Sequence, residues 1–229
     1  MTTFQQTALI LIIIWLVIIS RFHRSRIVLI GGLFVIGLYT IMALAYRQVT
    51  FSELGLGTPH SWLSTLGYAL AGPAVMIAYS PVADRLATRW FERPPTLDAF
   101  GAIQQSTGKL IAGIVVAWVL GGILEKLIAR GVVLQSIKTF LGVWLVEPVA
   151  TVIAICMAAT GAGLLHFYQG PRAVVIITQL SILFGVLFVV SGYNLCAVMI
   201  CHGLYDTIAF IRFATRKSRY SSLVGTKDV

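Results

Sequence analysis

Charged residues are scarce in this sequence. Asp, Glu, Lys and Arg make up 11% of its 229 residues, whereas a soluble domain is about one quarter charged. Hydrophobic residues make up 58%. This composition excludes an ordinary soluble domain and predicts a protein that is largely surrounded by lipid.

Acidic residues are the scarcest charged group, with 8 Asp and Glu against 17 Lys and Arg and a net charge of +9. The basic residues lie in short segments between apolar runs. This pattern is typical of membrane topology and not of a nucleic-acid-binding face. The expected partner is therefore the lipid bilayer, and no nucleic-acid partner is expected.

Cysteine is also rare. Cys156, Cys196 and Cys201 lie in apolar runs without a CxxC spacing, so we expect buried and unreactive thiols. The first residues lack the basic segment and the cleavage pattern of a secretory signal. The first apolar run is therefore expected to remain as an anchor.

Apolar runs of membrane-spanning length are abundant, since a helix needs about 20 mostly apolar residues to cross the hydrocarbon core. The sequence predicts an all-α fold, a polytopic transmembrane helix bundle of about seven to eight spans. We expect one integral membrane domain over residues 1–229, with no soluble domain in its loops. The expected spans are Thr7–Ser20, Ile27–Tyr46, Trp62–Ser80, Leu110–Leu134, Val149–Phe167, Val174–Val190 and Leu195–Phe213.

The basic residues predict the orientation, because cytoplasmic connections are enriched in Lys and Arg. Only Arg47 and Lys138 lie in one set of connections. We therefore expect a protein of the bacterial cytoplasmic membrane with its N-terminus outside and its C-terminus in the cytoplasm. Residues 214–229 are expected to form a basic cytoplasmic tail. The opposite set contains Arg21, Arg24, Arg26, Arg85, Arg89, Arg93, Lys109, Arg172, Arg212, Arg216, Lys217, Arg219 and Lys227.

Four ionisable residues interrupt the C-terminal apolar runs: Glu125, His166, His202 and Asp206, with Arg130 nearby. Such side chains are costly at bilayer depth and usually mark functional sites. His202 and Asp206 share one helix face, where the carboxyl group can orient the imidazole. The alternatives are a purely structural His–Asp pair and, for His166, an interfacial position at a helix end.

Together these side chains fit either a metal site or a site in which a general base activates water. The HExxH zinc pattern is missing, and Ser181 and Ser191 lack the glycine-rich turn of a serine nucleophile. If a divalent metal such as zinc is bound, its expected ligands are Glu125, His166 and His202.

A single site requires Glu125 and His166 to lie close together. In plain antiparallel spans Glu125 and His166 would lie near opposite membrane surfaces. Glycine pairs are recognised kink sites, and Gly121-Gly122 lies in the fourth expected span. Either this pair bends or breaks the span, or the helix is long and strongly tilted, and we expect an irregularity of some kind near Gly121.

Three segments in order carry a family resemblance over about residues 110–213. Residues 125–131, EKLIARG, resemble the EExxxR-G motif of the CAAX-protease and bacteriocin-processing (CPBP, or Abi) family, which includes Ras-converting CAAX endopeptidases. Residues 166–170, HFYQG, resemble the end of its FxxxH motif, and residues 194–206 resemble its HxxxN/D motif with Asn-Leu upstream. Residues 51–57, FSELGLG, are similar to a segment before the family's core.

The resemblance implies an intramembrane endopeptidase acting on a membrane-associated or lipidated peptide or protein, with residues 109–213 as the catalytic core and residues 1–108 as N-terminal spans and loops. Carried over, Glu125 is the general base and His166 helps to hold the attacking water. His202 stabilises the oxyanion, and Asp206 orients His202 or donates while protonated. The expected supporting residues are Arg130 and Asn194.

Two positions depart from the family pattern: Lys126 replaces the second Glu of the first motif, and Ala162 replaces the Phe of the second. On an α-helix Lys126 and Arg130 share a face and repel each other, whereas Glu125 lies about 140° away from Arg130. We expect either that Lys126 extends away to the membrane surface or that another acid, such as Glu147, faces Arg130.

Lys126 also favours a non-enzymatic alternative. In this alternative the chain is a catalytically impaired family member that acts as a membrane scaffold, a regulator or a bacteriocin-immunity protein. A proton-coupled transporter is a third class, which the lack of an inverted repeat disfavours.

Overall fold

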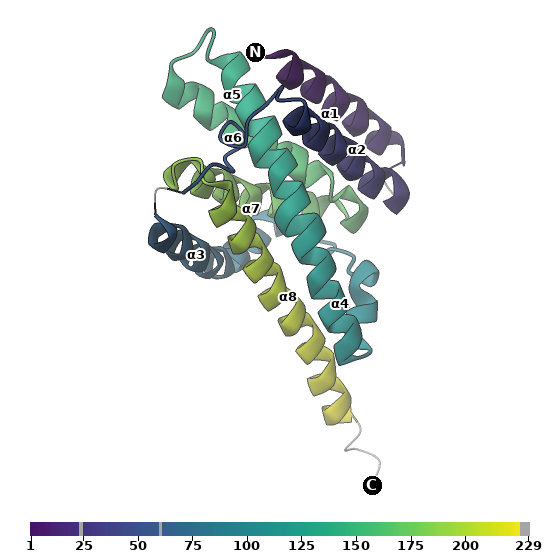
Figure 1. Cartoon of the computed structure of the whole chain (residues 1–229). Helices are drawn as coiled ribbons and strands as arrows, with labels where there is room; N and C mark the ends of the chain where they lie inside the picture. The colour runs from purple at the N-terminus through teal and green to yellow at the C-terminus, as the bar shows by residue number, and fades with distance from the viewer. Residues whose placement is uncertain (23–24, 60, 225–229) are drawn as a thin grey trace.

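The computed structural model describes residues 1–22, 25–59 and 61–224, without the side chains of Arg26, Ala99 and residues 216–224. Within these ranges the chain consists of helices joined by loops and contains no strand, so the all-α prediction is confirmed (Figure 1). The α-helices are α1 Thr3–Phe22, α2 Arg26–Ala45, α3 Trp62–Thr88, α4 Thr107–Ala117, α5 Gln135–Leu141, α6 Glu147–Leu164, α7 Pro171–Val190 and α8 Leu195–Val224. The short or irregular ones are η1 Asp98–Gln104, η2 Trp118–Glu125, η3 Leu127–Leu134 and η4 Phe167–Gln169.

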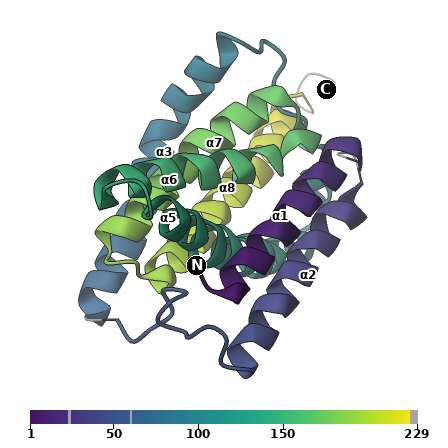
Figure 2. The ribbon, with the colours of Figure 1, turned by 90° about the horizontal axis from the view of Figure 1, so that it is seen from above.

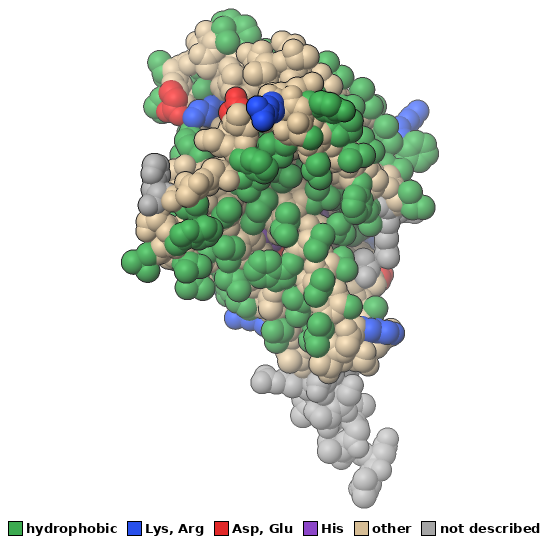
Figure 3. All heavy atoms as spheres, viewed as in Figure 1, with side chains coloured by type: hydrophobic (Ala, Val, Ile, Leu, Met, Phe, Trp, Pro, Cys, Tyr) green, Lys and Arg blue, Asp and Glu red, His purple; other side chains and the backbone are tan. Residues whose placement is uncertain are grey.

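Seven helical segments in the described ranges are long and apolar enough to cross a membrane, which confirms the predicted polytopic bundle. The protein is an integral membrane protein. Figure 3 shows hydrophobic side chains over the middle of the visible face, with charged side chains above and below them. Large apolar side chains such as Leu63 and Ile27 are more than four-fifths exposed, as expected when lipid and not water is the neighbour.

Local sequence explains where the helices begin. Ser25, Ser61 and Ser106 precede α2, α3 and α4, and each hydroxyl accepts a hydrogen bond from a backbone N–H in the first turn. Such caps satisfy donors that have no partner within the helix. Proline lies in the first turn of α6 and α7, where a missing N–H costs nothing.

Helix α6 lies inside the bundle and is the most buried of the seven spans. It packs closely on α7, since a methyl group at Gly163 would meet the Thr178 hydroxyl and one at Gly185 would meet Ile155. Small residues permit such close packing in membranes. The small residues that precede His166 therefore allow α6 to pack in the interior of the bundle.

The helices surround the ionisable residues. Seen from above, α1 and α2 form a hairpin on one side and α3 lies on the other, with α6, α7 and α8 between them (Figure 2). Helix α3 packs against α7 and α8, η2 packs along α8, and η3 packs against α6. The segment from α4 to α5 is one continuous helix from Thr107 to Leu141.

Several expected boundaries were wrong. Helix α3 continues beyond Ser80 through Pro81 to Thr88, and the fourth span extends to Leu141 instead of Leu134. Helix α6 ends at Leu164, so His166 lies beyond it. Among the cysteines only Cys201 is buried, and Cys156 is exposed on the outer surface of the bundle. The described part of the structure does not include Arg24, Lys227 or the side chains of Arg216, Lys217 and Arg219.

Candidate active site

Glu125 lies near the middle of the fourth span, which is 35 residues long. The helix changes to π geometry over Trp118–Glu125 and again over Leu127–Leu134. Segments of π-helix inside α-helices occur frequently at functional sites. The irregularity expected near Gly121 is therefore confirmed, and the extra length of the span keeps Glu125 away from both of its ends.

The glycine pair brings this helix against α8. A methyl group at Gly121 would be 3.2 Å from Asp206 Oδ2 and 3.4 Å from His202 Cε1. One at Gly122 would be 3.4 Å from the Met199 carbonyl oxygen. The absence of side chains at these two positions lets the helix that carries Glu125 pass directly beside the His202–Asp206 pair.

His202 and Asp206 form a close pair on α8. Asp206 Oδ2 lies 3.1 Å from His202 Nε2, and His202 is 9% exposed. The imidazole packs on the Phe184 ring with a centroid distance of 4.8 Å. Its Nδ1 is buried and has no hydrogen-bond partner within the described residues. Asp206 therefore orients the ring and leaves one polar atom of it available.

His166 lies in the turn between α6 and η4. Its Nδ1 is 2.9 Å from the Ala162 carbonyl oxygen. Because a carbonyl only accepts, Nδ1 carries the proton in this arrangement and Nε2 is left as an acceptor. The partner is the backbone of Ala162, so the replacement of the family's Phe at this position does not remove the contact that orients His166.

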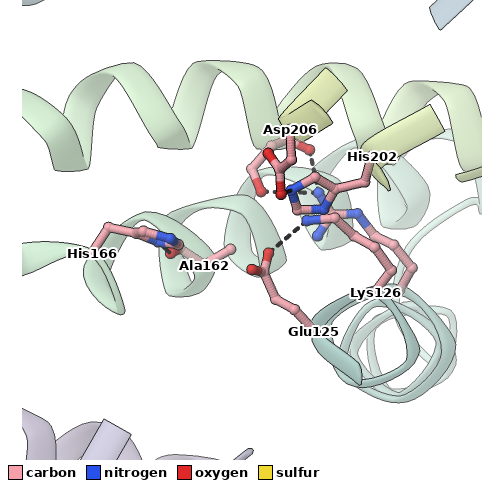
Figure 4. A network of polar contacts seen from close by, with 8 residues as sticks. Glu125, Lys126, Ala162, His166, His202 and Asp206 are labelled. Atoms are coloured by element: carbon pink, nitrogen blue, oxygen red, sulfur yellow. Dashed lines mark hydrogen bonds and ion pairs between the residues drawn. The ribbon is translucent and has the colours of Figure 1, made fainter. Parts of the chain in front are cut away.

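Glu125 lies between His166 on one side and the His202–Asp206 pair on the other (Figure 4). Its carboxylate is close enough to interact electrostatically with both imidazoles. The side chain of Glu125 is 13% exposed. The structure therefore brings the four expected residues into one neighbourhood, with a carboxylate at its centre.

Lys126 is the main departure from the sequence-based expectation. It does not extend to the membrane surface, because it is only 1% exposed. Its Nζ donates a hydrogen bond of 2.5 Å to Glu125 Oε1, and it lies 4.6 Å from the centroid of the Phe184 ring. Neighbouring residues do not normally face each other on a helix, so the buried surroundings select this contact.

Arg130 is fully buried and points to α7. Its Nη2 donates to the Ser181 carbonyl oxygen at 2.5 Å and to the Ser181 hydroxyl at 2.9 Å. Glu147 pairs with Lys138 instead, at 3.0 Å. The hypothesis that Glu147 faces Arg130 was therefore wrong, and a backbone carbonyl and a hydroxyl occupy the expected place of an acid.

Asn194 joins the beginning of α8 to α3. Its Oδ1 accepts a hydrogen bond from the Ala197 N–H, and its Nδ2 donates to Thr65 Oγ1 at 2.7 Å. Just after it, the Leu195 N–H donates to the Gly55 carbonyl at 2.8 Å. Gly55 has φ +77°, a conformation that glycine adopts without strain. The segment over residues 51–57 thus supports the helix that carries His202.

Sequence reasoning missed two contributors from α7. Phe184 contacts both the Lys126 ammonium and the His202 ring, and Ser181 binds Arg130. The polar Ser181 within an apolar span was a usable signal for the second. No signal in the sequence identified Phe184, because a phenylalanine in an apolar span is ordinary.

The arrangement of the donor atoms bears on the metal hypothesis. Within the described residues, no three His, Cys, Asp or Glu side chains are arranged to hold a metal ion. The Lys126 ammonium lies on one oxygen of Glu125, where a ligand oxygen would have to face the ion. The residues therefore do not fit a metal site in this arrangement, and we derive no chemical step through a metal.

Comparison with known proteins shows a family to which part of the chain is similar. The family described as type II CAAX prenyl endopeptidase Rce1-like matches residues 107–208, a range that includes all four ionisable residues and Asn194. Neither a curated protein nor a solved structure matches the chain. The family resemblance inferred from the three motifs is confirmed.

Proposed function

We propose that this integral membrane protein hydrolyses a peptide bond in a membrane-associated or lipidated peptide or protein, since residues 107–208 match the Rce1-like type II CAAX prenyl endopeptidase family. The observation that supports this proposal is the position of the Glu125 carboxylate between two imidazoles in the interior of a helix bundle. A carboxylate and an imidazole that converge on one water are sufficient for general-base hydrolysis.

In the proposed reaction, Glu125 removes a proton from water while the water oxygen bonds to the peptide carbonyl carbon. His166 accepts a hydrogen bond from the same water through Nε2, since its Nδ1 is engaged by the Ala162 carbonyl. Glu125 then passes the proton to the leaving amine nitrogen as the C–N bond breaks. These steps consume one water molecule and require no other reactant.

His202 is the proposed donor to the oxyanion. Asp206 accepts from Nε2, so Nδ1 is the remaining ring nitrogen, and it donates when the ring is the imidazolium. A buried donor directed at developing negative charge is among the largest contributions to acyl-transfer catalysis. In this proposal Asp206 orients His202, and Asn194 and Arg130 support the helices that carry the site.

The proposal is tested with purified protein in bilayers and a library of membrane-anchored peptides. Wild type is compared with Glu125→Gln and His166→Ala, with and without a chelator, and Glu92→Gln serves as the control because Glu92 is exposed and distant from the site in sequence. We expect cleavage by wild type and Glu92→Gln only. Full activity of Glu125→Gln contradicts the mechanism, and loss of wild-type activity in chelator establishes a metal requirement.

A catalytically impaired scaffold or regulator is the second candidate, and the Lys126 contact favours it. The ammonium lies on the carboxylate that has to act as a base. Under this alternative, well-folded wild-type protein cleaves no member of the library, and a bacteriocin-immunity or assembly role requires no hydrolysis.

We also propose an outside N-terminus and a cytoplasmic C-terminus in a bacterial cytoplasmic membrane. The contact of Gln5 with Thr139, 3.4 Å, supports an N-terminus at the same end of the bundle as the loop that follows Lys138. Accessibility of single cysteines introduced at the two ends to an impermeant thiol reagent tests this orientation, after the three native cysteines are replaced.

A further inference from the structure

Lys126 occupies the position at which the family motif has a second glutamate. A lysine in a membrane helix usually directs its charge toward the surface, and a charge retained at bilayer depth requires a partner. Lys126 is 1% exposed and has two partners, the Glu125 carboxylate and the Phe184 ring. Its ammonium is therefore part of the site and not of the lipid-facing surface.

The contact has an electrostatic consequence for Glu125. An uncompensated carboxylate in a medium of low dielectric is costly. The ammonium, 2.5 Å from Oε1, supplies the opposite charge. Arg130 does not contact Glu125 directly, because the hydrogen bonds of its guanidinium go to Ser181. Lys126 is thus the cation in direct contact with the proposed base.

The contact also has a geometric consequence. Lys126 engages one oxygen of the carboxylate, and no hydrogen bond within the described residues engages the other. The Phe184 ring lies 4.6 Å from the ammonium and 4.8 Å, centroid to centroid, from the His202 ring. One aromatic side chain therefore fixes both the cation that holds Glu125 and the imidazole opposite it.

We propose that Lys126 is a positioning residue of the hydrolytic site. Its ammonium holds Oε1 of Glu125, so that Oε2 receives the proton of the attacking water. This inference rests on the proposed hydrolytic function. Lys126 acts through Glu125 and does not need to touch the substrate, so its removal affects turnover and not substrate binding.

The test compares two lysines with the same kinds of contact. Lys138 pairs with Glu147 at 3.0 Å and lies 4.1 Å from the Tyr193 ring centroid, but it is not near the site. Cleavage of a peptide that wild type hydrolyses is measured for Lys126→Met, Lys126→Arg and Lys138→Met. Methionine keeps the apolar stem on the ring and removes the ammonium, whereas arginine keeps a cation.

We expect Lys126→Met to lower kcat by about 100-fold with KM within about twofold, the size of effect that misplacement of a reacting group produces. Lys126→Arg is expected to recover part of kcat, and Lys138→Met to retain both constants. Wild-type kcat in Lys126→Met overturns the positioning role while the proposed function stands. Activity of Glu125→Gln overturns the function itself.

A second measurement does not depend on activity. A membrane-permeant carbodiimide joins a carboxylate and an amine in contact, and the pair loses one water that the carbodiimide takes up. Wild type is expected to yield a fragment containing Glu125 and Lys126 that is lighter by one water, and Lys126→Met is expected not to. An unmodified wild-type fragment overturns the proposed contact.

Discussion

Two lysines of this protein each pair with a glutamate and an aromatic ring but differ in burial, and Lys138 also donates a hydrogen bond to the Tyr193 hydroxyl. Lys126 pairs with Glu125 and lies over Phe184, with side-chain exposures of 2% for the lysine and 13% for the glutamate. Lys138 pairs with Glu147 and lies over Tyr193, with exposures of 23% and 63%. A contact alone therefore does not define a role, because burial determines the free-energy cost of leaving either charge without its partner.

At the peripheral pair, water and headgroups replace a lost partner, so such pairs contribute little to stability. At the buried pair, the removal of one partner leaves a charge without compensation, which is far more costly than the pair's own net contribution. The buried pair therefore restricts which residues can occupy the site. The peripheral pair connects α5, α6 and the loop before α8, and either of its residues can be replaced at little cost in stability.

The largest expected effect comes from the loss of the buried carboxylate. Glu125→Gln is expected to abolish cleavage and to lower the free energy of unfolding by about 3 kcal/mol, because the buried Lys126 ammonium loses the carboxylate that contacts it. Glu147→Gln is expected to leave both the cleavage rate and the free energy of unfolding unchanged within error. Unfolding in detergent micelles, followed by circular dichroism, measures this, and equal losses in the two variants would contradict the comparison.

The double variant Glu125→Gln/Lys126→Met tests whether the unpaired ammonium causes the loss of stability. It removes both buried charges, so we expect recovery of most of the roughly 3 kcal/mol lost in Glu125→Gln without any recovery of cleavage. A double-mutant cycle over Glu125 and Lys126 is expected to give a larger coupling energy than the matching cycle over Glu147 and Lys138. Similar coupling energies would show that burial does not distinguish the pairs.

A methyl group added to the buried region is expected to reduce activity by about tenfold, since small misplacements at a reacting centre are costly. Gly121→Ala directs a methyl at Asp206 Oδ2, 3.2 Å away. Gly67→Ala on α3 meets nothing within 4 Å and is expected to keep full activity while it raises helix stability by up to about 1 kcal/mol. Rates from the peptide assay test this, and an unaffected Gly121→Ala would show that the helix can move aside.

The smallest expected effect is a salt dependence. Exposed charges are screened within about 3 Å at ~1 M salt, against about 10 Å at ~0.1 M. We expect salt to lower the thermal midpoint of wild type slightly and to leave that of Lys138→Met unchanged. The measurement is the thermal midpoint of both proteins over a series of salt concentrations. An equal decrease of the midpoint in both would show that the effect comes from other surface charges.

Much of this arrangement could be predicted from the sequence. Apolar runs determine membrane spans because the cost of exposing the backbone to lipid leaves few alternatives. The glycine pair indicated the irregular helix, and the three motifs indicated Glu125, His166 and the His202–Asp206 pair. These features depend on local sequence, and the structure bears out the spans, the irregularity and the i, i+4 contact.

The position of Lys126 could not be predicted. An α-helical wheel directs it toward Arg130, but the π-helical segments on either side of it change the angles, and its partner Phe184 comes from another helix. Likewise, the end of α6 before His166 depends on a turn whose backbone bonds involve Gly163 and Gln169. Both features depend on contacts between helices, and a single sequence does not show which residues of different helices are in contact.

The carbonyl of Gly55, which accepts from the first N–H of α8, has a consequence for exchanging parts between relatives. It lies well before residues 107–208, the range that matches the family. A chimaera that takes only this range from another protein keeps every proposed catalytic side chain. It succeeds only if the recipient's own loop presents a carbonyl to the helix that bears His202, so residues 51–57 should be transferred together with the core.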